Sequence, residues 1–432
     1  MQFSFSTRVR QLKCLQLLAL ATIFALSACG DEVPALLPSL QPQPETEGLL
    51  GDECNTDEDC MAELRCNALS WQCKPPAPLP NLPSALSSVD EVDLGRHEVG
   101  PEGSEFLSVE VPEDALSLTL IADSPGAYYL WIDRVEDPAG KLPVNYDSDH
   151  SPVKSLGGSG AAVVQIPTSL RAKVNPGRYR FTVKSMSPIQ THLYALIKRG
   201  PKKNTGILNI NCFLVGLPGL SANNAATHPE FQASLERVKL IYAQAGIIFG
   251  KVSYIDILGD DAAEFTVINS VSGVKSELNR MFQLSAKAPS RALNLFFVQE
   301  IQYAMDKFTI LGIAGGAPGA GSLHGTEASG VAVTVANFSR SAENNGHVIA
   351  HEGGHYLGLK HVSESHGQEH DQIADTAECW GGRDGDQDGF VMPKECKGFG
   401  ASNLMFWKTW PKSPVQLSPT QSYVMRRNPL VH

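Results

Sequence analysis

The chain has 432 residues, of which 42% are hydrophobic and 19% are charged, a composition typical of folded protein rather than of disordered or fibrous chains. This length exceeds one ordinary core, so we expect two or three folded units. Acidic residues outnumber basic ones, and the formal net charge of −11 disfavours nucleic acid and anionic membrane surfaces as partners. We therefore expect no nucleic-acid partner.

The N-terminus has the layout of an export signal. Basic residues precede an apolar run from Leu15 to Leu26 that is too short to span a bilayer. The run ends in Leu26-Ser27-Ala28-Cys29, which resembles the lipobox of bacterial lipoproteins. The resemblance implies that residues 1–28 are removed and that Cys29 becomes lipidated. The alternative is an ordinary signal peptide with an incidental cysteine. We expect an exported monomer, anchored by lipid to a membrane of the bacterial cell envelope.

The next segments lack the residues needed for a core. Residues 29–50 are Pro-rich and are expected to form a tether, and residues 75–88 form a second Pro-rich linker. Between them, residues 51–74 form a cysteine-rich module with few large apolar residues, so disulfides are expected to hold it together. A zinc knuckle is the alternative, although a Cys-x-x-Cys pair is missing. The connectivity is left open among Cys54, Cys60, Cys66 and Cys73.

Residues 89–200 contain short runs of alternating apolar and polar residues between clusters of Pro, Gly and Asp. One run places Tyr179, Phe181 and Val183 two residues apart. A period of two predicts half-buried strands, and several such runs predict an all-β sandwich. The segment loosely resembles the jelly-roll-like accessory domains of secreted bacterial peptidases. A structural or glycan-binding module is the default role.

Residues 201–432 interleave strand and helix patterns, which predicts an α/β unit. The segment from Leu208 to Leu214 alternates as in a half-buried strand, with Cys212 on the buried face. Apolar residues three and four apart predict a helix from His228 to Gly246. Further predicted elements are a helix over Val274–Leu284, strands over Leu293–Val298 and Val331–Val335, and a Gly-rich loop over Gly312–Gly330.

A histidine motif predicts a metal site within this unit. In a helix, His351 and His355 lie on one face, at a separation that one zinc ion can bridge. Glu352 lies one residue further round, where its carboxylate can reach water beside the metal without becoming a ligand. Gly358 can adopt the left-handed conformation that ends a helix, so that His361 meets the metal from another direction.

Three neutral imidazoles leave a fourth position open, as in catalytic zinc sites. Such an ion polarises a carbonyl and lowers the pKa of water towards about 7, while Glu352 takes the proton and later delivers it to the leaving amine. Chance produces the whole spacing in fewer than about one chain in 10⁴, so a surface helix with incidental histidines is disfavoured. His347, His366 and His370 lack the matching acid or glycine turn and are not assigned as ligands.

The spacing His-Glu-x-x-His-x-x-Gly-x-x-His resembles that of metzincin metallopeptidases. The resemblance implies an α/β (α+β) metzincin-like catalytic domain over residues 201–432, Zn²⁺ as cofactor, and a protein or peptide substrate. Asn403-Leu404-Met405-Phe406 is similar to the Met-turn of that family, in which Met405 would form an apolar floor beneath the zinc. An ordinary core methionine is the alternative.

The stretch between these motifs is similar to pappalysin-like metzincins. The likeness runs from Asp371 to Thr376, continues through Cys379 and Cys396 to the Met-turn, and closes with Leu417-Ser418-Pro419-Thr420-Gln421. Two departures limit what is carried over. Trp407 stands two residues after the methionine, where several metzincin groups place a tyrosine that assists the transition state, so no such helper is assigned. Val362, directly after the third histidine, matches none of the residues that mark the better-known groups.

The same stretch carries a candidate calcium loop. Alternating carboxylates precede Gly389, and a glutamate stands at the twelfth place, so that the oxygens could converge on one hard cation. The alternative to Ca²⁺ is an acidic, solvated turn. Cys379 and Cys396 bracket the loop and are expected to form a disulfide. The predicted calcium-binding residues are Asp384, Asp386, Asp388 and Glu395.

The sequence thus predicts a lipid-anchored zinc endopeptidase with a cysteine-rich module and a β-sandwich ahead of the catalytic domain. One alternative is a surface adhesin or glycan-binding lipoprotein whose peptidase-like domain is inactive. The presence of Glu352 beside all three histidines argues against it, because an inactive domain has no chemical need for the base. A zinc-dependent amidase acting on cell wall or small amides is a third possibility.

Overall fold

The computed structural model describes residues 25–27, 65–67, 72–74, 86–302, 304–305, 308–335, 341–408 and 415–432. The predicted lipidation site Cys29, the tether and most of the signal peptide, cysteine-rich module and second linker lie outside the described residues. In the cysteine-rich module, β2 (Arg65–Asn67) pairs antiparallel with β3 (Gln72–Lys74) and brings the backbone of Cys66 opposite that of Cys73. The disulfides of this module stay a prediction.

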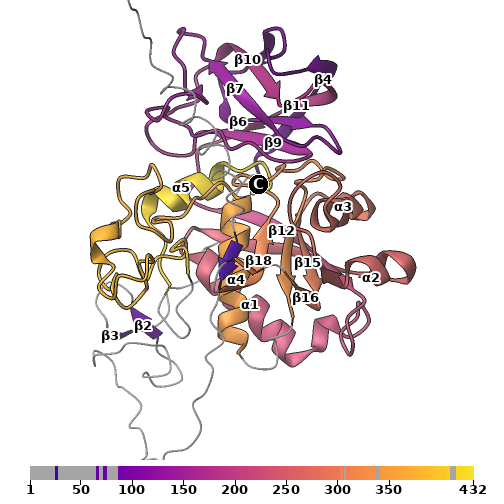
Figure 1. Ribbon diagram of the computed structural model, residues 1–432, viewed down its shortest axis with the longest axis vertical. Coiled ribbons are helices and arrows are strands. Elements are labelled where there is room, and N and C mark those ends of the chain that lie inside the picture. Colours follow the sequence, from indigo (N-terminus) through magenta and orange to yellow (C-terminus); the bar gives the residue numbers. More distant parts are fainter. Residues whose placement is uncertain are drawn as a thin grey trace, which may run out of the picture.

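Residues 88–199, here named the two-sheet region, form two antiparallel four-stranded sheets (Figure 1). One sheet has the order β5-β10-β7-β8 and the other β4-β11-β6-β9. Inward side chains of both sheets, including Val109, Phe181 and Leu193, share one hydrophobic cluster, because successive residues of a strand point to opposite faces. The strands are β4 (Ser88–Val99), β5 (Leu107–Val111), β6 (Ala115–Asp123), β7 (Leu130–Glu136), β8 (Val144–Asn145), β9 (Ala161–Ile166), β10 (Gly177–Ser185) and β11 (Ile189–Arg199).

The rest of the chain is built on a mixed sheet of order β1-β18-β19-β15-β12-β13, in which β17 also pairs with β18. Neighbours from β13 to β19 run parallel, whereas β18 runs antiparallel to β19 and β1 antiparallel to β18. A separate parallel pair joins β14 (Val267–Ile268) to β16 (Glu300–Ile301). The strands of the main sheet are β1 (Ala25–Ser27), β12 (Gly206–Val215), β13 (Ile247–Ile257), β15 (Leu293–Val298), β17 (Ala304–Met305), β18 (Phe308–Ala314) and β19 (Val331–Thr334).

Helices cover both faces of this sheet. Buried residues of α1 (Pro229–Ala243) and α4 (Ala342–Tyr356) form one hydrophobic cluster, and those of α2 (Gly259–Phe265) and α3 (Glu277–Gln283) belong to another. The helix expected from His228 to Gly246 is therefore present as α1. None of the helices in the described residues is long and apolar enough to cross a membrane. The remaining helical segments are η2 (Ala225–Thr227), η3 (Leu284–Lys287), η4 (Gly381–Arg383) and α5 (Pro419–Arg427).

The central strand β12 differs from the expectation. A half-buried strand was predicted, but both faces of β12 are covered from Ile210 onward. Cys212 lies in the cluster with α1 and α4, as expected for a core residue, whereas Phe213 lies in the cluster with α2 and α3. The polar residue Asn211 is also buried. Its side-chain amide donates to Asn294 Oδ1 at 2.9 Å, which offsets the cost of removing the amide from water. The polar residue in the alternating pattern of β12 thus pairs inside the sheet and does not face solvent. The prediction that one face of this strand is exposed was wrong.

Two predicted boundaries also change. The helix expected from Val274 begins at Glu277, because the Ser276 hydroxyl accepts the Asn279 amide hydrogen and caps the helix there. The Gly-rich loop expected over Gly312–Gly330 starts later, because its first residues belong to β18. Among the described residues, β18 is the only strand that pairs antiparallel with the parallel strands, and it was not predicted from the sequence.

The two-sheet region packs against the C-terminal end of the chain, where Figure 1 places α5 beside it. The buried Lys198 ammonium, at the end of β11, donates to the backbone oxygens of Arg426, Asn428 and Val431. These bonds satisfy main-chain oxygens at and beyond the end of α5, where helix carbonyls lack partners. Gln165 of β9 lies against Gly358, directly after α4. The two-sheet region thus contacts the turn that leads from α4 to His361.

Candidate metal centre

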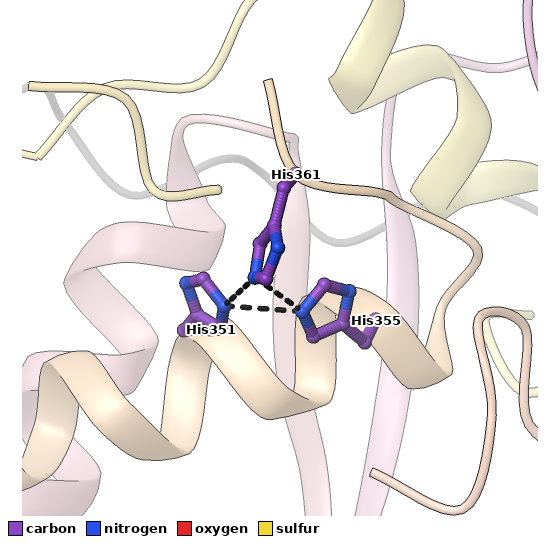
Figure 2. Close-up of side chains that lie close together, drawn as sticks. All are labelled: His351, His355 and His361. Atoms are coloured by element: carbon purple, nitrogen blue, oxygen red, sulfur yellow. Dashed lines mark hydrogen bonds between the residues drawn. The ribbon is translucent and has the colours of Figure 1, made fainter. Parts of the chain in front are cut away.

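Three histidines converge at the end of α4. His351 and His355 lie on one face of the helix, and His361 returns to it after the turn (Figure 2). The Nε2 atoms lie 3.1 Å apart for His351 and His355, 3.2 Å for His351 and His361, and 3.1 Å for His355 and His361. Zinc bonds of about 2.0–2.1 Å at tetrahedral angles separate nitrogens by about 3.3 Å, so the spacing fits one such ion. This group, here named the histidine triad, could therefore hold a metal.

The turn between the second and third histidines has the predicted form. Helix α4 ends at Tyr356, and Gly358 has a φ of 104°, a left-handed conformation that other residues resist. The amide of Gly358 donates to His355 O at 2.8 Å, and that of Leu359 donates to Gly354 O at 3.0 Å. These bonds satisfy the last helix carbonyls and reverse the chain, so that His361 faces the helix it has just left.

Two of the imidazoles are oriented by main-chain oxygens. His351 Nδ1 lies 2.7 Å from Leu404 O, and His355 Nδ1 lies 2.9 Å from Leu359 O. Because a carbonyl oxygen only accepts hydrogen bonds, Nδ1 carries the hydrogen in both rings. Each Nε2 therefore presents a lone pair towards the other, an arrangement that a metal cation stabilises.

The third imidazole has a partner of a different kind. His361 Nδ1 lies 2.9 Å from Glu364 Oε2, so a carboxylate accepts its hydrogen. Glu364 was not predicted from the sequence as part of the site. A signal was available, because Glu364 follows the third predicted ligand by three residues and a carboxylate beside a metal-binding histidine is a common pairing.

Burial keeps the helix histidines uncharged. His351 and His355 are fully buried, and burial lowers the pKa of both well below the usual histidine value. The neighbouring imidazoles of the triad lower it further. One turn earlier, burial and then the charge of Arg237 lower the pKa of His347 to about 3. Neutral imidazoles are the form that binds metals.

The other histidines considered from the sequence stand apart. His366 is exposed, and its Nδ1 accepts the Gln368 amide hydrogen at 3.1 Å. His370 Nδ1 lies 3.1 Å from Val362 O. Among the described residues, the ligand group at the end of α4 includes neither of them and does not include His347. The geometry therefore agrees with the choice of His361 as the third member.

The acid of the motif is buried beside the sheet. Glu352 follows His351 in α4 and is fully inaccessible to solvent. A Cβ on Gly312 of β18 would lie 2.6 Å from Glu352 Cγ and 3.0 Å from Val348 Cγ1. Only a residue without a side chain lets the backbone of β18 pass this close to α4. The strand thus runs directly over the carboxyl-bearing side of the helix.

Packing against α4 explains the two glycines, Gly353 and Gly354, that lie between its metal-binding candidates His351 and His355. A Cβ on Gly353 would collide with the hydroxyl of Tyr242, which donates to Ala350 O at 3.0 Å. A Cβ on Gly354 would lie 2.7 Å from Met405 Sδ. Met405 is fully buried, and the predicted Met-turn therefore passes against the helix between the two histidines.

Trp407 is packed within the segment that follows the third histidine. Its indole Nε1 donates to Val391 O at 2.7 Å, and the side chain is buried. This segment also contains the predicted disulfide, because Cys379 and Cys396 are bonded with a Cα–Cα distance of 5.6 Å. Val362 donates to Met405 O at 2.9 Å and so joins the start of the segment to its end.

Three of the four predicted calcium ligands lie together. Carboxylate oxygens of Asp384, Asp386 and Asp388 fall within 4.8 Å of one another. Glu395 accepts the amide hydrogens of Gly385 at 2.6 Å and Met392 at 2.7 Å, and it closes the loop from its other end. Exposed acidic turns also adopt such arrangements without an ion. Calcium binding stays a prediction from the sequence.

No family model matches the chain, and no curated protein matches its sequence. Among solved structures, metalloproteinase-II from Bacteroides fragilis aligns at 16% identity over 38% of this chain and 47% of its own, with a TM-score of 0.22. A structure of infectious bursal disease virus, Gx strain, aligns at 8% identity over 32% of this chain and 39% of its own, with a TM-score of 0.17.

The contact below the helix gives a testable prediction. Gly353→Ala should lower the free energy of unfolding by about 1–3 kcal/mol, because the new methyl group collides with the Tyr242 hydroxyl. Tyr242→Phe alone should cost about 1 kcal/mol for the lost bond to Ala350 O. The double variant should be more stable than Gly353→Ala, because the colliding oxygen is gone. Denaturant unfolding of the three variants measures this. Strictly additive losses would contradict the packing described.

The acidic loop gives a second prediction. If calcium neutralises its carboxylates, added calcium should slow proteolytic nicking between Glu378 and Lys397, and Asp386→Ala should abolish that protection. Limited proteolysis with mass mapping measures both effects. Asp149→Ala, at an exposed aspartate of the two-sheet region, serves as control and should keep the protection. Nicking that is indifferent to calcium would identify an ordinary acidic turn.

Proposed function

We propose that this protein is a zinc-dependent endopeptidase of the metzincin type. The observation that carries the proposal is the convergence of three Nε2 atoms from His351, His355 and His361, each with its Nδ1 already engaged. Zinc is the favoured ion, because imidazole nitrogens suit it and a three-histidine set is typical of catalytic zinc sites. Three protein ligands also leave a position for the reacting groups.

Glu352 is the proposed general base. When bound, zinc would polarise the substrate carbonyl and lower the pKa of water. Glu352, next to His351 and shielded from solvent, would take the proton of the attacking water and deliver it to the leaving amine.

The position of β18 favours an extended polypeptide as substrate. This strand passes over Glu352 at Gly312, and its outer edge pairs antiparallel with β1. An edge that accepts one strand can accept another, because its amides and carbonyls point outward in the sheet plane. A peptide bound there would lie beside the general base. This supports an endopeptidase over an amidase that acts on small molecules.

We further propose that the enzyme belongs with the pappalysin-like metzincins and acts at the bacterial cell envelope, attached through lipid on Cys29. The support for this comes from the sequence, namely the lipobox-like Leu26-Ser27-Ala28-Cys29 and the segment from Asp371 to Thr376. The two-sheet region would act as an accessory β-sandwich. The alternative of an inactive peptidase-like domain on an adhesin predicts no hydrolysis at all.

Replacing the base should separate metal binding from catalysis. Glu352→Ala should retain zinc and lose hydrolysis by at least about 100-fold, because the three ligands stay in place while the proton carrier is lost. The measurements are metal content and cleavage of a peptide library by the purified protein. Cleavage at the unmutated rate would rule out the mechanism, and zinc binding without cleavage by the unmutated protein would favour the inactive alternative.

The ligand assignment has its own control. His361→Ala should lower zinc content under dilute chelator, whereas His366→Ala should not, because His366 is exposed and outside the triad. Equal metal loss from both variants would undo the assignment.

The proposed anchor is tested by one substitution. Cys29→Ser should move the protein from the membrane fraction to the soluble exported pool, because lipid attachment requires the thiol. Cell fractionation with immunodetection measures the shift. A variant that still sediments with membrane would contradict lipid anchoring at this cysteine.

A further inference from the structure

The partners of the three Nδ1 atoms differ in kind. His351 and His355 donate to main-chain oxygens of Leu404 and Leu359, which are neutral and cannot be removed by substitution. His361 donates to the carboxylate of Glu364 at 2.9 Å. One imidazole of the triad is thus held by a charged side chain, and it is the one that does not belong to the helix.

The origin of His361 makes this partner important. The rotamers of His351 and His355 are restricted by the helix that carries them, because side chains four residues apart stack on one face. His361 lies beyond the turn at Gly358, where no helix restricts its ring. Without a bond to Nδ1, the ring could rotate and turn Nε2 away from the other two.

The charge matters as well as the direction. Three neutral imidazoles bring no negative charge to a divalent cation, and they are buried where solvent offers little compensation. A carboxylate that accepts the Nδ1 hydrogen increases electron density on the ring and strengthens Nε2 as a ligand. Because Glu364 is about three-quarters buried, with 23% of its side chain exposed, solvent screens this effect only in part.

The structure fixes Glu364 from both sides. Its preceding neighbour Ser363 accepts the amide hydrogen of Cys379 at 2.7 Å through Oγ. Its following neighbour Ser365 accepts the amide hydrogen of Val391 at 2.8 Å through its carbonyl. Cys379 is in turn bonded to Cys396, so the disulfide-linked segment after the third histidine holds the glutamate in place.

The backbone of Glu364 is pinned in the same way. Its amide donates to Glu369 O at 2.9 Å, and its carbonyl accepts the amide hydrogen of Gly367 at 2.8 Å. The neighbouring ammonium of Lys360 donates to Lys154 O at 3.1 Å. The carboxylate is therefore directed at His361 by a local framework, rather than resting there as one of several exchangeable surface pairs.

On this basis we propose that Glu364 is a positioning residue of the metal site, which orients His361 and raises its affinity for the ion. The inference rests on the proposed function, because it assumes that the triad binds zinc. It also gives the disulfide-linked segment a role in metal binding, since that segment fixes the position of Glu364.

The test measures zinc affinity by competition with a chromophoric chelator, together with the thermal midpoint of the metal-free protein. Glu364→Ala should weaken zinc binding about 10–100-fold, the usual effect of losing such a partner. Glu364→Gln should lie between this variant and the unmutated protein, because the amide oxygen still accepts the hydrogen but carries no charge. The metal-free midpoint should change little in Glu364→Gln.

A neighbouring acid supplies the matched control. Glu369→Gln removes a negative charge from the same segment, but at an exposed side chain. Its zinc affinity should equal that of the unmutated protein. The absorption spectrum of the cobalt-substituted protein adds a second readout, because a change in Glu364→Gln but not in Glu369→Gln would place the effect on the ligand field rather than on overall stability.

Zinc binding by Glu364→Ala within twofold of the unmutated protein would overturn the proposal while leaving the zinc site intact. Equal weakening by Glu364→Gln and Glu369→Gln would also overturn it, because general electrostatics would then account for the effect. Failure of the unmutated protein to bind zinc would instead overturn the proposed function, and this inference with it. The two failures are therefore distinguishable in one titration series.

Discussion

Three imidazoles can bind one ion only if each ring turns an unprotonated nitrogen inward. In this protein that condition is met by occupying every Nδ1, with Leu404 O, Leu359 O and Glu364 as acceptors. To meet this condition, segments far apart in the sequence have to fold against one another. Leu404 has to return beneath α4, the turn at Gly358 has to bring His361 back, and the segment between them has to be folded.

The same requirement explains the glycines within α4 and on the strand beside it. Gly353 and Gly354 let Tyr242 and Met405 approach the helix from below, and Gly312 lets β18 pass over Glu352. Each glycine replaces a side chain that would push a neighbouring element outward. The helix is thereby held from several sides with its histidines at fixed spacing, and pre-organised ligands lose less freedom when they bind an ion.

The sequence predicted the triad because helical spacing and a glycine turn are local features, readable at His351, His355 and Gly358 without any knowledge of the fold. The Cys379–Cys396 disulfide was predicted from the way the two cysteines bracket the acidic loop. The role of Glu364 depends on where the chain goes after the turn, which spacing alone does not specify. Burial of Asn211 and pairing of β18 depend on partners far away in sequence. The local alternation of apolar and polar residues therefore predicted an exposed face for β12 that is absent, and it did not predict β18.

A crystal structure of the zinc-loaded protein, with anomalous diffraction on both sides of the zinc absorption edge, would test the histidine site most directly. The prediction is a single strong peak bounded by the Nε2 atoms of His351, His355 and His361, at about 2.0–2.1 Å from each, with any further ligand an oxygen. A zinc peak at Asp384, Asp386 and Asp388 with none at the histidines would contradict the central claim. So would an ion held by fewer than three of these nitrogens.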